Sequence, residues 1–145
     1  MTAEPKELDA ATHERIKAHC AAGDRLAATR AFEGAIAEYN KAWALVPDPP
    51  NEGNASTWIL AAIADAAFLG GYLTSAREAL QYAMTCPGAI GNPFLHLRFG
   101  QVLFDAGEPD AAADELIRAY MGAGREIFAS EHSRYLEFLK TRAKL

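Results

Sequence analysis

Three eight-residue segments, AIAEYNKA at 35–42, AREALQYA at 76–83 and AADELIRA at 112–119, share one pattern. Each segment begins and ends with alanine and has a large side chain four positions after its first alanine: Tyr39, Leu80 and Leu116. Spacings of three and four residues place these positions on one face of an α-helix. Small residues let a second helix approach closely, and the large ones fill the gaps beside them. The pattern therefore predicts three copies of a helix that packs against another helix.

A preceding helix completes each copy. Gly23, Ala64 and Gly100 stand 12 positions before the first alanines of the three segments, and stretches rich in proline and glycine at 47–54 and 86–93 separate the copies. We expect helices at about 7–29, 32–46, 55–70, 73–86, 93–106 and 109–122, and a last helix near 132–143. Asn54 or Ser56 is expected to cap the third helix, and Ser130 or Ser133 the last.

Composition supports an all-α protein, because the chain has 31 alanines and only two valines. Its 145 residues fit a single domain spanning 1–145.

The net charge of -5 and the absence of a basic stripe argue against nucleic acid as a partner. No apolar run has the roughly 20 residues of a membrane span, and the N-terminus lacks a signal-peptide pattern, so we expect no membrane association and a cytoplasmic location. Cys20 and Cys86 are then expected to be free thiols.

These features resemble the tetratricopeptide repeat family, whose repeat of about 34 residues is a helix–turn–helix. The similar repeats lie at about 16–49, 57–90 and 93–126. The strings STWILAAIAD at 56–65, GNPFLHLR at 91–98 and RAYM at 118–121 look like those of small stand-alone bacterial members of the family. The resemblance implies an α-solenoid of three helical hairpins in a right-handed superhelix, closed by a C-terminal capping helix at about 132–143.

The resemblance also implies a concave groove lined by the first helix of each pair. Its candidate residues for binding a partner are Lys17, Asp24, Trp58, Asp65, Phe68, Phe94, Leu97, Gln101, Phe104 and Asp105. Clustered exposed aromatic side chains mark an interface, and the aspartates would favour a basic partner segment. Alternatively, one or two of the aromatic side chains pack under the 47–54 loop or against the N-terminal stretch, and the aspartates lie on a solvated helix face.

We therefore expect a non-enzymatic protein-binding module that holds a segment of another protein in this groove. The aromatic residues would anchor the segment, and Asp65, Gln101 and Asp105 would fix its register through hydrogen bonds. The sequence predicts no cofactor, metal site or catalytic residue. Two alternatives stay open: an immunity protein that neutralises a bacterial toxin, as some small bacterial proteins of this kind do, and a homodimeric scaffold whose groove is filled by a second copy.

An enzyme is the weakest interpretation. His19 and Cys20 are adjacent, but neighbouring side chains on a helix diverge by about 100°. His96, which stands where the family usually has a large apolar residue, is expected to be a packed, hydrogen-bonded histidine.

Overall fold

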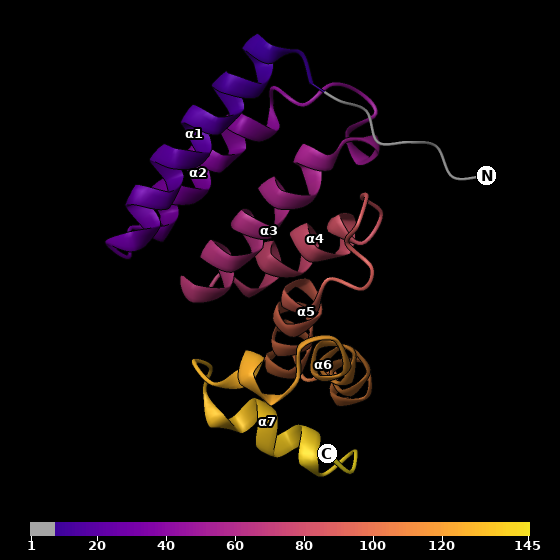
Figure 1. The fold of residues 1–145 in the computed structure, drawn as a ribbon. Helices are drawn as coiled ribbons and strands as arrows, with labels where there is room; N and C mark the ends of the chain where they lie inside the picture. The colour runs from indigo at the N-terminus through magenta and orange to yellow at the C-terminus, as the bar shows by residue number, and fades with distance from the viewer. Residues whose placement is uncertain (1–7) are drawn as a thin grey trace, which may run out of the picture. The chain divides into compact units, whose positions relative to one another are not determined.

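The computed structural model describes residues 8–145, which form seven α-helices (Figure 1). These are α1 (Ala10–Ala28), α2 (Phe32–Trp43), α3 (Asn54–Leu69), α4 (Leu73–Ala83), α5 (Pro93–Asp105), α6 (Pro109–Ala123) and α7 (Ser133–Lys140). Two short 3-10 helices, η1 (Pro50–Glu52) and η2 (Arg125–Phe128), lie in the connections. No β-strand occurs between residues 8 and 145, so the predicted all-α class is confirmed.

The chain divides into two compact units, residues 1–89 and 90–145. In the first unit, α1 packs against α2 and α3 against α4, and α2 also contacts α3. In the second unit, α5 packs against α6, and α7 contacts α6 and η2. Two of the predicted hairpins therefore belong to the first unit, and the third belongs to the second unit together with the last helix.

The helix ends differ from the predicted ones by a few residues. The second helix ends at Trp43 instead of residue 46, because the amides of Leu45 and Val46 bond to carbonyls three residues back rather than four. The fourth helix ends at Ala83 instead of residue 86 for the same reason. The first begins at Ala10, and the expected start at residue 7 lies outside the described residues.

The small residues of the repeated pattern are buried where the helices of each hairpin meet. All of them are fully buried: Ala35, Ala42, Ala64, Ala76, Ala83, Ala112 and Ala119. The large residues of the pattern, Tyr39, Leu80 and Leu116, are buried as well. The prediction that these positions form the contact between helices is confirmed.

The first turn of α3 forms hydrogen bonds with two loops of the first unit, the one before α3 and the one after α4. The Ser56 hydroxyl donates a hydrogen bond to the Pro50 carbonyl, and the Thr57 hydroxyl donates one to the Pro87 carbonyl at 2.7 Å. Ser56 is therefore not the helix cap, and Asn54 lies inside the helix; the N-cap is Gly53, with no side-chain hydrogen bond.

The predicted cap of the last helix is also wrong. The residue at the N-cap of α7 is His132, whose Nδ1 accepts a hydrogen bond from the Arg134 amide at 3.1 Å. A histidine ring acceptor here does what a serine hydroxyl does at most N-caps.

Within the described part of the chain, no α-helix combines the length and the apolar character that crossing a bilayer requires.

Replacing Gly100 with alanine is expected to destabilise the α5–α6 hairpin. A Cβ atom at this position would lie 2.6 Å from Cγ and Cδ2 of Leu116 and 3.1 Å from its backbone nitrogen. Overpacking of this kind costs about 1–3 kcal/mol. Gly34→Ala in α2 is the matched control, because its Cβ would meet Leu26 at 3.4 Å and alanine favours a helix by roughly 1 kcal/mol. Urea unfolding followed by circular dichroism compares the two, and equal midpoints would contradict the close-contact argument.

Candidate functional site

The predicted binding residues are divided equally between the two units. In the first unit, Lys17 and Asp24 lie on α1, and Trp58, Asp65 and Phe68 lie on α3. In the second unit, all five lie on α5: Phe94, Leu97, Gln101, Phe104 and Asp105.

Trp58, Asp65 and Phe68 share one face of α3, and we call them the α3 stripe. Separations of seven and three residues bring side chains back to the same side of a helix. The Trp58 side chain is 38% exposed, and Asp65 and Phe68 are half-buried. Asp65 is the one charged residue of α3. The stripe therefore combines an exposed indole, a carboxylate and a second aromatic ring.

Asp24 of α1 and Asp65 of α3 both act on the buried Tyr39 side chain. The buried Tyr39 hydroxyl donates a hydrogen bond to Asp24 Oδ1 at 2.7 Å. The pKa of Tyr39 is raised, first because the ring is buried, then because of this hydrogen bond and the charge of Asp24, with smaller contributions from Cys20 and Asp65. Two aspartates from two helices thus act on the same phenol. The hydrogen bond from Tyr39 fixes the orientation of Asp24. It uses one of the roughly four acceptor positions of an ionised carboxylate.

Lys17 lies one turn from Glu14 on the outer surface of α1. Its Nζ is 3.6 Å from the Glu14 carboxylate, and both side chains are more than half exposed. Such an exposed pair contributes little to stability, so Lys17 keeps its rotational freedom.

The adjacent His19 and Cys20 do not form a reactive pair. His19 Nδ1 lies 3.2 Å from Glu38 Oε2, on α2. Burial, and then the charge of Asp24, raise the pKa of the Cys20 thiol to about 11. Because the thiolate is the nucleophilic form, Cys20 is poorly suited to nucleophilic chemistry at neutral pH. Cys20 and Cys86 are both free, buried thiols.

In the second unit, Gln101 is completely buried and hydrogen-bonded within its own chain. Its Oε1 accepts a hydrogen bond from Arg98 Nη1 at 2.7 Å, and its Nε2 donates one to Glu131 Oε1 at 2.8 Å. Arg98 Nη1 also donates to Glu131 Oε1. The expectation that Gln101 offers its amide to a partner is therefore wrong, because both ends of the amide are already used.

Phe104 and Asp105 hold α7. The Phe104 ring centroid lies 5.7 Å from that of Tyr135 and 4.8 Å from that of Phe138. Asp105 accepts hydrogen bonds from the Tyr135 hydroxyl at 2.8 Å and from Arg134 Nη2 at 3.2 Å. These two residues were expected to face a partner; they instead bind the chain's own last helix. The alternatives open from the sequence were packing of aromatic side chains under the 47–54 loop or against the N-terminal stretch. Packing against the last helix was not among them.

The last two predicted residues of α5 differ from each other. Leu97 is 2% exposed and cannot line an open groove, which corrects its assignment. Phe94 is 37% exposed, and the Arg98 guanidinium lies 5.1 Å from its ring centroid. Phe94 therefore remains accessible but already has a cationic neighbour.

Arg98 and Glu131 are the polar residues that the sequence interpretation missed. Arg98 lies in the apolar run from Leu95 to Leu103 and is 6% exposed. A charged side chain in such a run needs a partner when it is buried. That signal was present in the sequence, but nothing in it identified Glu131, more than 30 positions later, as the partner.

His96 is buried and hydrogen-bonded at both ring nitrogens, as expected. The Gly91 amide donates to Nε2 at 2.9 Å, and Nδ1 lies 2.6 Å from Glu115 Oε2. Because Nε2 accepts a hydrogen bond, this network assigns the ring proton to Nδ1, which donates to Glu115.

The described side chains do not form a cluster that could bind a metal ion. Among residues 8–145, no group of three or more His, Cys, Asp or Glu side chains is arranged to hold a metal ion.

Comparison with known proteins gives no family assignment. No protein-family model matches the chain, and a search of curated proteins finds no match.

Glu131→Gln is expected to destabilise the second unit and to change how its stability depends on pH. Burial opposes ionisation of Glu131, but hydrogen bonds from Gln101 and Arg98, together with the charge of Arg98, lower its pKa. The ionised group therefore stabilises the fold above its ordinary pKa of about 4.3, and this contribution is lost as the pH falls through the lowered value. At pH 7 the substitution removes the negative charge to which Arg98 and Gln101 donate their hydrogen bonds, at a cost of about 2 kcal/mol.

Thermal unfolding between pH 3 and pH 7 tests this expectation. The difference between wild type and Glu131→Gln should be large at pH 7 and shrink in acid. Glu137→Gln is the matched control, because Glu137 is an exposed glutamate of α7. Parallel stability curves for the wild type and Glu131→Gln would contradict the role of the ionised carboxylate.

Proposed function

We propose that this protein is a non-enzymatic binding module, built from three tetratricopeptide-like hairpins, that holds a segment of a partner protein. The observation that supports this proposal best is the exposed Trp58 indole of the α3 stripe. Tryptophan is among the residues that most often dominate affinity at protein interfaces.

The geometry narrows the proposed binding surface to the first unit. Gln101, Phe104 and Asp105 are engaged with residues of the C-terminal segment, and Leu97 is buried. Displacing the segment would take the Glu131 carboxylate away from the buried Arg98 and Gln101 side chains, which is costly. The partner is therefore proposed to contact Trp58, Phe68, Asp24 and Asp65, with Lys17 at the margin.

The charge of the surface indicates the partner's chemistry. Asp24 contributes negative potential on α1, where its Oδ1 accepts a hydrogen bond from Tyr39, and α3 carries no basic residue. A lysine or arginine of the partner would bind near Asp24, and an apolar side chain beside it would cover Trp58. Electrostatic attraction of this type mainly accelerates association.

Trp58→Ala is expected to weaken binding of the partner by about tenfold or more, as for interface tryptophans elsewhere. Asp24→Asn should lower the association rate and reduce its dependence on salt. A partner recovered on the immobilised protein and identified by mass spectrometry supplies the ligand, and its affinity for each variant is measured by calorimetry. Met121→Ala is the control, because this apolar side chain is 80% exposed in the other unit. Unchanged affinity of a folded Trp58→Ala variant would exclude the stripe as the binding surface.

A further inference from the structure

A second surface of the first unit lies between α2 and α4. It is a groove of about 480 Å³ with α3 along its floor, within the range of roughly 300–1,000 Å³ that is typical of binding sites. The α2 wall carries Ile36, Asn40 and Trp43 at helical spacing. None of the residues of the α3 stripe lines this groove.

The interior of the groove is apolar. Leu60 and Ile63 of α3 form the floor, and Ala79 of α4 lies beside them. These three residues are each less than a tenth exposed, because the neighbouring helices cover most of their surface. An apolar side chain that entered the groove would replace water on this floor, which is favourable.

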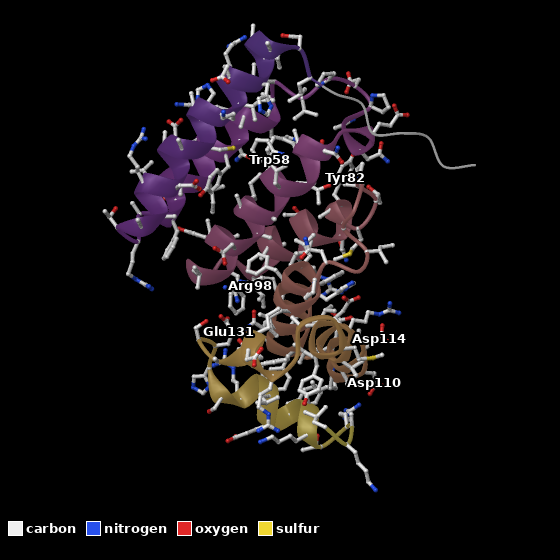
Figure 2. All side chains as sticks on the ribbon, viewed as in Figure 1. Trp58, Tyr82, Arg98, Asp110, Asp114 and Glu131 are labelled. Carbon is white, nitrogen blue, oxygen red and sulfur yellow. The ribbon has the colours of Figure 1, made fainter. Side chains whose placement is uncertain are left out.

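An aromatic pair connects the two walls. The rings of Trp43 on α2 and Tyr82 on α4 meet edge to face, with centroids 5.7 Å apart and an interplanar angle of 85°. Tyr82, seen on α4 in Figure 2, is 38% exposed. Because two helices fix the rings, little conformational entropy remains to be lost on binding. Tryptophan and tyrosine are also the residues most often responsible for affinity at interfaces.

The polar rim selects the charge of the occupant. Of the described residues that line the groove, Glu78 alone carries a formal charge, and it is exposed. No cation between residues 8 and 145 forms an ion pair with it. Asn40 and Ser75, also exposed at the rim, can form hydrogen bonds with a peptide backbone. The lining therefore complements a ligand that is apolar at its centre and basic at its edge.

We propose that this groove binds a short segment of a partner protein that presents an apolar side chain next to a lysine or arginine. The apolar side chain lies over Leu60 and Ile63 against the edge of the aromatic pair. The basic group pairs with Glu78, and the backbone of the segment bonds to Asn40 and Ser75. This surface is independent of the α3 stripe, because Trp58, Asp65 and Phe68 do not line it.

The probe is a displayed library of random dodecapeptides, selected on the immobilised full-length protein. We expect enrichment of peptides with a large apolar residue beside lysine or arginine.

Two variants test where the selected peptide binds. Ser75→Trp, which fills the groove from its rim, and Glu78→Lys, which reverses its charge, should each lower the affinity for the selected peptide by about tenfold or more. The matched controls are Thr74→Trp and Gln81→Lys, at exposed positions of α4 outside the lining, and should change affinity by less than about twofold.

Fluorescence of the two tryptophans of the chain distinguishes binding in the groove from binding at the α3 stripe. In Trp58→Phe the remaining indole, Trp43, reports on the groove, and in Trp43→Phe the remaining Trp58 reports on the stripe. A groove peptide should shift the emission of the first variant and leave that of the second unchanged. Thermal unfolding of every variant verifies that it is folded.

Several outcomes overturn the proposal. They are a selection without enrichment, enrichment of acidic peptides, and a selected peptide that tolerates both Ser75→Trp and Glu78→Lys. A dimer in solution that is abolished by Ser75→Trp would mean that a second copy of the chain occupies the groove, which also overturns it. None of these outcomes bears on Trp58, so a failure of the groove and a failure of the α3 stripe are distinguishable.

Discussion

Close contact between the two helices of each hairpin is the constraint on which the other features depend. At Gly23 an added Cβ would lie 2.4 Å from the Tyr39 ring, and at Gly100 it would meet Leu116 at 2.6 Å. Only a hydrogen fits at these points. Close approach fixes the rotation of each helix about its axis, because a small turn would bring a larger residue into the contact. That rotation decides which side chains of α3 and α5 face outward.

In the second unit, the outward side of α5 determines how the C-terminal segment packs. Arg98 and Gln101 point away from the hairpin contact and would be costly to bury without partners. Glu131 supplies a carboxylate to both, and Asp105 binds Tyr135 and Arg134 further along the same helix. The hydrogen bonds specify the position of the segment, and the ring contacts of Phe104 add apolar burial. An acidic residue and an aromatic residue that look like binding groups in the sequence are thus structural.

Periodicity predicted the helices well, because spacings of three and four residues are a local property of the chain. Ala35, Ala76 and Ala112 could be assigned to the core from sequence for this reason. The partners of α5 could not, since Gln101 and Glu131 are 30 residues apart and no local pattern connects them. A buried charge within an apolar stretch needs a partner, so the sequence indicates that Arg98 has one without indicating which residue it is. Composition also did not reveal the groove between α2 and α4, because the space between two helices depends on how they pack and not on how many residues of each type they contain.

The helix α3 contributes to both proposed surfaces of the first unit. Successive residues of a helix are about 100° apart, so Leu60 lies about 200° around the axis from Trp58. Asp65 returns to the side of Trp58, and Ile63 to the side of Leu60. This explains why α3 is apolar on nearly all sides and has a single charged residue. Two segments on opposite sides of one helix do not compete for space. If they belong to one partner, binding of the first raises the effective concentration of the second, so two weak contacts can yield one strong attachment.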